Sequence, residues 1–403
     1  MNKIRPALAL ALLAVFTVAC QNQPNETASA ADEAKATPAV STSFEASPQS
    51  VAETEVTTLE IGQQAPDFNL PGADCKNYRL SDFADAPVLA VVFTCNHCPT
   101  AQAYEQRIKD LVTDYQRQGV AVVAISPNSP LAVLYNELGY SDLGDTYEDM
   151  QKAAEDRNFN FPYLYDGDDH AVSLQYGPVA TPHTFVFDQD RKLRYVGRLD
   201  ASEKPGTGQA EDVRAAIDAV LAGETVPTAT TKTFGCSVKW AWKNEYREKM
   251  YKEWDETPVT LEEIDEAGVA DLLKNDTEKL RLINVWATWC GPCVLEYPDF
   301  IEMQRMYGDR AFEFVSVSAD KPAQRDKALA FLQKKHSVLD NYIFDKDDTY
   351  ALIEAVDPDW QGALPYTMLV EPGGQRIYSQ QGTIVPFELR KTIVEHELMG
   401  RYY

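Results

Sequence analysis

The sequence offers little that could bind nucleic acid or a metal ion. Its 37 Lys and Arg residues are outnumbered by 62 Asp and Glu residues, which gives a net charge of −25. A chain this acidic repels phosphate, so no nucleic-acid partner is expected. Histidines are few, and no metal site is expected because most of them lack the spacing of metal ligands. The histidines without such spacing are His170, His183, His336 and His396.

Long apolar runs are also missing. Ala7–Ala19 is the main apolar segment, and it is too short to span a bilayer as a helix. Because two basic residues precede it, we interpret residues 1–20 as a signal peptide. Its end, Thr-Val-Ala-Cys, resembles the lipoprotein box of bacteria, although Leu usually stands where Thr17 is. The resemblance implies a lipid on Cys20 and a protein held on the periplasmic side of a bacterial membrane; an ordinary cleaved signal peptide is the alternative.

Residues 21–57 contain few large apolar side chains and many Ala, Ser, Thr, Pro, Glu and Gln residues. Such a segment cannot bury enough apolar surface to fold alone. It is predicted to be a flexible tether.

Two thiols follow an apolar run in the second half of the chain. Leu282–Trp286 is typical of a short buried strand, and Cys290 and Cys293 come directly after it, at the start of a helical segment. The amides at a helix N-terminus stabilise a thiolate, so Cys290 is expected to attack and Cys293 to resolve. A structural disulfide or half of a zinc site is the alternative.

The sequence Trp-Cys-Gly-Pro-Cys, which begins at Trp289, resembles the active site of thioredoxin. Glu296 and Pro298 extend it to the Cys-x-x-Cys-x-x-Glu-x-Pro pattern of the TlpA/ResA-like thioredoxins. Asn284 stands where thioredoxin carries a buried Asp. The resemblance covers residues 259–403 and implies that Trp289 contacts substrate and that Glu296 handles protons; a solvated Glu296 is the alternative.

The first half of the chain has a similar layout. Gly-x-x-Ala-Pro-x-Phe-x-Leu, from Gly62, resembles the opening of the AhpC/TSA redoxins. An apolar run then leads to Cys95-Asn96-His97-Cys98 and a helical segment. By analogy with the second half, Cys95 is expected to attack and Cys98 to resolve. His97 is expected to stabilise the thiolate, or else to be a solvated turn residue.

The repetition predicts the fold. Later landmarks also match, above all Thr181-Pro182 and Leu364-Pro365, each of which precedes a strand pattern. In the thioredoxin fold this proline is cis and faces the thiols, so these four residues are expected to contact substrate. We therefore predict an α/β protein with two thioredoxin-like domains in tandem, each a central mixed β-sheet flanked by helices. The domains are expected at residues 58–224 and 259–403.

Residues 225–258 are predicted to be a connector with a helix, because aromatic residues and Met recur in it at intervals of four. It contains Cys236, and Cys75 lies near the start of the first domain. With Cys20 lipidated and the other thiols paired, an exported protein is expected to join Cys75 and Cys236 in a structural disulfide. Two free buried thiols are the alternative.

The sequence thus predicts an extracytoplasmic thiol–disulfide oxidoreductase that works through mixed disulfides, without metal or organic cofactor. Its expected partners are protein thiols and disulfides and an electron donor that the sequence does not identify. A thiol peroxidase is one alternative, although the Pro-x-x-x-Thr-x-x-Cys pattern of peroxiredoxins fits neither Cys95 nor Cys98. A module that binds peptides or a metal on the same fold is another.

Overall fold

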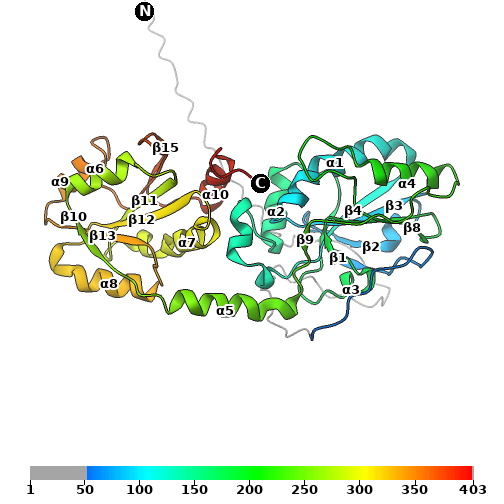
Figure 1. The fold of residues 1–403 in the computed structure, drawn as a ribbon, viewed down its shortest axis with the longest axis horizontal. Helices are drawn as coiled ribbons and strands as arrows, with labels where there is room; N and C mark the ends of the chain where they lie inside the picture. Colours follow the sequence, from blue (N-terminus) through cyan, green and yellow to red (C-terminus); the bar gives the residue numbers. More distant parts are fainter. Residues whose placement is uncertain (1–51, 402–403) are drawn as a thin grey trace, which may run out of the picture. The chain divides into compact units, whose positions relative to one another are not determined.

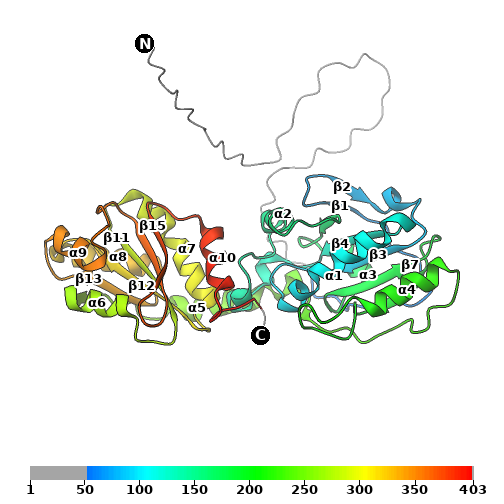
Figure 2. The same ribbon diagram turned by 90° about the horizontal axis from the view of Figure 1, so that it is seen from above.

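The computed structural model describes residues 52–401 (Figures 1 and 2). The predicted signal peptide, the lipidation site Cys20 and most of the predicted tether lie outside the described residues. Within residues 52–401 no helix is long and apolar enough to cross a membrane.

The first domain is built around a five-stranded sheet with the order β5-β4-β3-β7-β8. Strands β3, β4 and β5 run parallel, whereas β7 and β8 are antiparallel to their neighbours. Its elements are β1 (Asn69–Pro71), β2 (Asn77–Arg79), η1 (Leu80–Phe83), β3 (Leu89–Phe93), α1 (Pro99–Tyr115), η2 (Gln116–Gln118), β4 (Ala121–Ser126), η3 (Pro130–Ala132), η4 (Tyr135–Tyr140), α2 (Tyr147–Asp156), β5 (Tyr163–Tyr165), α3 (Ser173–Tyr176), β6 (Ala180–Thr181), β7 (His183–Phe187), β8 (Leu193–Gly197) and α4 (Glu211–Leu221).

The connector and the second domain follow. The connector holds β9 (Cys236–Ser237), η5 (Ala241–Lys243) and α5 (Asn244–Asp255). A six-stranded sheet with the order β10-β13-β12-β11-β14-β15 forms the second domain. Its elements are β10 (Glu262–Ile264), α6 (Glu266–Lys274), β11 (Leu280–Trp286), α7 (Gly291–Tyr307), β12 (Phe312–Ser318), η6 (Pro322–Gln324), α8 (Arg325–Lys334), β13 (Asp340–Phe344), α9 (Thr349–Val356), β14 (Tyr366–Val370), β15 (Arg376–Gln381) and α10 (Pro386–Glu395).

The central strand of each sheet is covered on both faces. Every residue of β3 and of β11 is buried. Successive side chains of a strand point to opposite faces, so Leu282 joins a core with α7 and α8, while Ile283 and Val285 join one with α6 and α9. Figure 1 shows the corresponding helices on the two faces of this sheet. The prediction of two thioredoxin-like domains with mixed sheets is confirmed.

Residues 127–149 form an insertion that the second domain lacks. The insertion carries η3 and η4. The Tyr307 hydroxyl of α7 donates to the Ser141 carbonyl at 2.8 Å, and Leu138 packs into the apolar cluster that contains α7. The insertion therefore contacts the second domain as well as the first.

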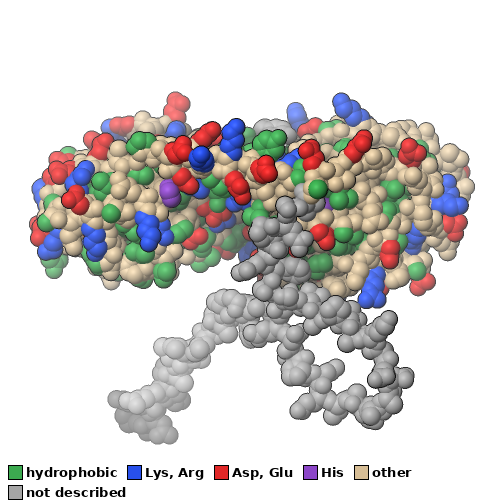
Figure 3. Space-filling view, turned by 90° about the horizontal axis from the view of Figure 1, so that it is seen from below, with side chains coloured by type: hydrophobic (Ala, Val, Ile, Leu, Met, Phe, Trp, Pro, Cys, Tyr) green, Lys and Arg blue, Asp and Glu red, His purple; other side chains and the backbone are tan. Residues whose placement is uncertain are grey.

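Acidic and basic side chains are intermixed on the face drawn in Figure 3, and neither sign forms one continuous patch there.

Candidate active sites

The site of the second domain lies between the end of β11 and the start of α7. Cys290 is the N-cap of α7, and its Sγ accepts a hydrogen bond from the Cys293 amide at 3.2 Å. The two cysteines are joined in a disulfide, and both are buried. An N-cap thiol faces the amides and the positive dipole end of its helix. Cys290 thus occupies the position that chemistry requires of an attacking thiol.

The turn that presents Cys290 is fixed by a buried carboxylate. Asp320 accepts from the Thr288 amide at 2.8 Å and from the Thr288 hydroxyl at 2.7 Å. These bonds tie the end of β11 to the segment after β12. The turn is therefore positioned before any partner arrives.

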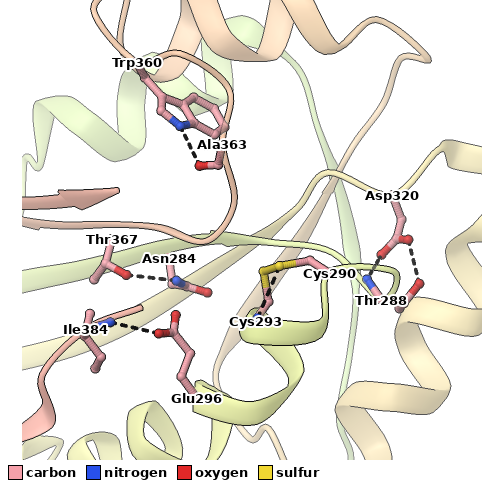
Figure 4. Close-up of a disulfide and its surroundings, with 10 residues drawn as sticks. All are labelled: Asn284, Thr288, Cys290, Cys293, Glu296, Asp320, Trp360, Ala363, Thr367 and Ile384. Carbon is pink, nitrogen blue, oxygen red and sulfur yellow. Dashed lines mark hydrogen bonds between the residues drawn. A yellow bond between two sulfur atoms is a disulfide. The ribbon is translucent and has the colours of Figure 1, made fainter. Parts of the chain in front are cut away.

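Two buried polar groups point toward each other beside this disulfide (Figure 4). Glu296 accepts from the Ile384 amide at 3.0 Å through Oε2, while its Oε1 has no partner among the described residues. Asn284 donates to Thr367 at 3.0 Å, and its Oδ1 is likewise without a described partner. Burial raises the pKa of Glu296 to about 7. Glu296 is therefore not a solvated helix residue, and it can hold or release a proton near neutral pH.

The residues expected to contact substrate in this domain differ in exposure. Trp289 is 61% exposed and borders a cavity of about 310 Å³ that Phe344 and Leu352 also line. The Leu364–Pro365 peptide is cis, as predicted, and the next residue pairs with Val285 of β11. Trp289 thus offers an apolar surface next to Cys290.

The site of the first domain differs from the prediction. The N-cap of α1 is Cys98, not Cys95, and its Sγ accepts from the Ala101 amide at 3.5 Å. Pro99 occupies the first turn, where its missing N–H costs nothing. The expectation that Cys95 stands at the helix start is therefore wrong.

Sheet register gives the same result. Phe93 pairs with the residue after cis-Pro182, as Val285 pairs with the residue after cis-Pro365. Cys98 and Cys290 stand at the same distance along the chain from these two strand positions. The two Cys-x-x-Cys motifs are consequently offset by one turn.

This offset changes the neighbours of each thiol in the first domain. Ala101 holds the place of Cys293, and Cys95 lies two residues after the end of β3. Cys95 and Cys98 are free and fully buried. Their sulfur atoms lie 3.2 Å from the Thr181 hydroxyl and 3.3 Å from the Thr181 carbonyl oxygen, respectively. Thr181, which precedes cis-Pro182, thus contacts both thiols.

The electrostatics favour Cys98 as the thiolate. Burial opposes its ionisation, yet hydrogen bonds with Cys236 and Cys95 and the charge of His97 hold the pKa of Cys98 well below its ordinary value. Burial, followed by the hydrogen bond with Cys98, raises the pKa of Cys95. A proton shared among these sulfurs therefore resides on Cys95 or Cys236 rather than on Cys98.

His97 is held by a carboxylate from the insertion. Its Nδ1 lies 2.6 Å from Asp145 Oδ2, and both side chains are buried. Burial alone would lower the pKa of His97, but the charge of Asp145 and its hydrogen bond together raise this pKa. Burial alone would raise the pKa of Asp145, but the charge of His97 and the hydrogen bonds that the carboxylate accepts together lower it. The buried Asp145 carboxylate therefore favours the charged form of His97, whose Nε2 has no partner among the described residues.

Asp145 also shapes the loop between the cysteines. Its Oδ1 accepts from the amides of Asn96 and His97 at 2.9 and 3.2 Å, and its Oδ2 accepts from Asn128 at 2.7 Å. Cys95, His97 and Asp145 place possible ligand atoms within 4.8 Å of one another. Because both carboxylate oxygens already accept hydrogen bonds, this group is better suited to holding His97 than to binding a metal.

Cys236 lies at this site and not where the sequence suggested. It is free, so the expected Cys75–Cys236 disulfide is wrong. The reason is a strand pairing: β9 runs antiparallel to β6, with Cys236 opposite Thr181. The Cys236 amide donates to Cys98 Sγ at 3.4 Å.

Sequence reasoning missed two residues of the first domain's site. Asp145 is one of several acids in the insertion, and no local pattern distinguishes it from the others. Cys236 is far away in sequence and arrives through the pairing of two short strands. Pro99 was the available signal for the helix start, because proline favours the first helical position.

Comparison with known proteins agrees with this architecture. The AhpC/TSA family profile matches residues 61–196, and the Redoxin profile matches residues 222–388. The thiol-disulfide oxidoreductase ResA of Geobacillus thermodenitrificans is 25% identical over 169 residues, which are 41% of this chain and 82% of ResA. Peroxiredoxin Bcp of Escherichia coli K12 is 28% identical over 150 residues, 34% of this chain and 85% of Bcp. The chain is also similar to the crystal structure of a hypothetical protein from Sinorhizobium meliloti 1021, with 35% sequence identity and a TM-score of 0.41. The match covers 47% of this chain and 98% of that protein.

Proposed function

Because the chain carries two tandem domains of the AhpC/TSA and redoxin families, we propose that it is a thiol–disulfide oxidoreductase with two separate redox sites. The observation that carries the proposal is the shared position of Cys98 and Cys290. Each caps a helix that follows the central strand of its sheet, where a thiolate is favoured. Each domain also has a cis-proline at the start of the strand that pairs with this central strand.

At the second domain's site the exchange has two steps. The Cys290 thiolate attacks one sulfur of a partner disulfide, a mixed disulfide forms, and the other partner sulfur leaves as a thiolate. The Cys293 thiolate then attacks Cys290 Sγ and releases the first partner sulfur. Two electrons have then passed from the protein to the partner. With its pKa near 7, Glu296 accepts the proton that Cys293 must lose.

At the first domain's site we assign the attack to Cys98. His97 supplies positive charge, and Asp145 keeps it protonated. Cys95 and Cys236 both lie against Cys98, so either could supply the resolving sulfur.

A thiol peroxidase is the second candidate function, and the burial of Cys98 favours it. Its thiol is 0% exposed, so a peroxide reaches it more easily than a folded protein does. The relative Bcp is named a peroxiredoxin. Peroxide consumption by the purified protein with a dithiol reductant would distinguish this function from disulfide exchange.

The proposal extends to the location. The basic start, the short apolar run and the lipobox-like end of residues 1–20 support export and lipid attachment at Cys20. The protein would then act on protein thiols and disulfides on the periplasmic side of a bacterial membrane. Incorporation of labelled palmitate by the wild type, and not by Cys20→Ala, would support the anchor. Equal labelling of both would exclude Cys20 as the lipidated residue.

The reaction itself is tested with a fluorescent peptide disulfide and a dithiol donor. We expect Cys98→Ala to lose the turnover that comes from the first domain and Cys290→Ala to lose the turnover that comes from the second. The double variant should lose all turnover. Full turnover by the double variant would contradict the proposal. Unreactive thiols together with a metal retained through dialysis would instead indicate a binding module.

A further inference from the structure

Strand β9 of the connector forms part of the first domain's site. Strand β9 pairs with β6, so that Cys236 stands opposite Thr181. The Thr233 hydroxyl donates to the Pro182 carbonyl at 3.0 Å, and the Thr181 hydroxyl donates to the Cys236 carbonyl at 3.5 Å. The connector is thus fastened on both sides of the Thr181–Pro182 bond.

The close approach depends on a glycine. Gly235 has φ +132°, and a Cβ there would lie 2.1 Å from the Thr181 carbonyl oxygen. Only glycine combines this conformation with this spacing at low cost. The sequence before Cys236 is therefore suited to bringing that thiol to Cys98.

Helix α1 carries no second thiol that could resolve a mixed disulfide at Cys98. The position of Cys293 in the second domain is taken by Ala101 in the first. Cys236, by contrast, packs with Cys95, Cys98 and Ala101. Its amide donates to Cys98 Sγ, and its thiol is hydrogen-bonded to the same sulfur.

Cys236 suits the resolving role better than Cys95. Cys95 is 3% exposed and lies two residues after the end of the central strand β3, and its sulfur contacts the Thr181 hydroxyl. Cys236 is partly exposed and sits on a two-residue ladder outside the main sheet. A short outer ladder can shift to let a sulfur approach in line with the bond that it must break.

We propose that Cys236 is the resolving thiol of the first domain's site. After Cys98 has attacked a partner disulfide, the Cys236 thiolate attacks Cys98 Sγ, the mixed disulfide breaks, and the partner sulfur leaves as a thiolate. A Cys98–Cys236 disulfide forms, two electrons have passed to the partner, and the Cys236 proton goes to that leaving thiolate. The proposal rests on the proposed disulfide exchange and adds a third cysteine to it.

The test is a disulfide map of the full chain. Reduced protein is exposed to oxidised glutathione, blocked with N-ethylmaleimide and digested with trypsin. Cleavage sites in the sequence isolate Cys236 in Thr233–Lys239 and keep Cys95 and Cys98 together in Leu80–Arg107. We expect these two peptides to be linked in the wild type and in Cys95→Ala.

The other outcomes are distinct. An internal disulfide in Leu80–Arg107 with alkylated Cys236 would overturn the role of Cys236 and leave the exchange chemistry intact. A fully alkylated Leu80–Arg107 would overturn both, because Cys98 would not have reacted.

Kinetics give a second readout. Cys236→Ser keeps the backbone contacts and removes the sulfur, so we expect a glutathione adduct on Cys98 that lasts about tenfold longer or more. The matched control is Ser237→Ala on the same strand, which should resolve the adduct at the wild-type rate. Wild-type resolution in Cys236→Ser, or slow resolution only in Cys95→Ala, would overturn the proposal. The disulfide of Cys290 and Cys293 should re-form normally in every variant, which controls for the oxidation conditions.

Discussion

Cys98 and Cys290 occupy equivalent positions in the two domains, although one is the second cysteine of its motif and the other is the first. Each accepts a hydrogen bond at the start of its helix. The residues around them differ. Cys293 follows Cys290 on the helix, whereas Cys98 has Cys95 before it and Cys236 beside it. The two domains therefore share a helix-capping thiol and differ in the thiols that surround it.

The first prediction concerns the thiolate of the first domain. In a Cys290→Ala/Cys293→Ala background, far-ultraviolet thiolate absorbance should be present at neutral pH, because hydrogen bonds and His97 stabilise the Cys98 thiolate. Cys98→Ala should abolish this absorbance, and the matched Cys95→Ala should retain it. The reverse pattern would restore Cys95 as the nucleophile.

The second prediction concerns Asp145. Replacement by Asn removes the charge that favours the protonated form of His97, so the pKa of Cys98 should rise. A pH titration of thiolate absorbance in the same background measures the change. Glu148→Gln is the matched control, because it removes an exposed charge from the part of α2 that lies at the end of the insertion. An unchanged titration in Asp145→Asn would mean that His97 does not act on Cys98.

The third prediction concerns Glu296 and stability. Its raised pKa means that the folded state binds this proton more tightly than the unfolded state. Relative to Glu296→Gln, the wild type should therefore lose about 1–3 kcal/mol of stability as the pH rises from about 5 to about 8. Denaturant unfolding at both pH values, followed by tryptophan fluorescence, measures this loss. The exposed Glu354→Gln should show no such dependence, and a pH-independent difference for Glu296→Gln would refute the assignment.

The fourth prediction concerns Gly235. Alanine would collide with the Thr181 carbonyl oxygen, so β9 should separate from β6 and Cys236 should be alkylated about tenfold faster. Gly223→Ala controls for backbone strain alone, because Gly223 also has a positive φ of +70° but no atom within 4 Å. Equal alkylation rates in the two variants would show that β9 is not held by this contact.

Much of the architecture could be predicted from the sequence. The strand, cysteine motif and helix of each half indicated the fold, and both Thr181-Pro182 and Leu364-Pro365 proved to be cis. The burial of Glu296 follows from its place on the helix after Cys293, which fixes which way the side chain faces. These features depend on local order along the chain, which a sequence shows directly.

The first domain's site could be predicted only in part. Identical Cys-x-x-Cys spacing concealed the offset, because spacing does not say which residue begins the helix. The position of Cys236 depends on a two-residue strand pairing across a long sequence separation. Nothing in the sequence indicated the pairing of strands β6 and β9, so pairing the cysteines by elimination gave Cys75–Cys236.

The most direct test of the account is to trap both nucleophiles in one molecule. A Cys95→Ala/Cys236→Ala/Cys293→Ala variant lacks every proposed resolving thiol and should keep two glutathione adducts after exposure to oxidised glutathione. Peptide mapping should place one adduct on Cys98 and the other on Cys290. A protein without stable adducts, or with adducts on other cysteines, would contradict the assignment of these two helix-capping thiols as the redox nucleophiles.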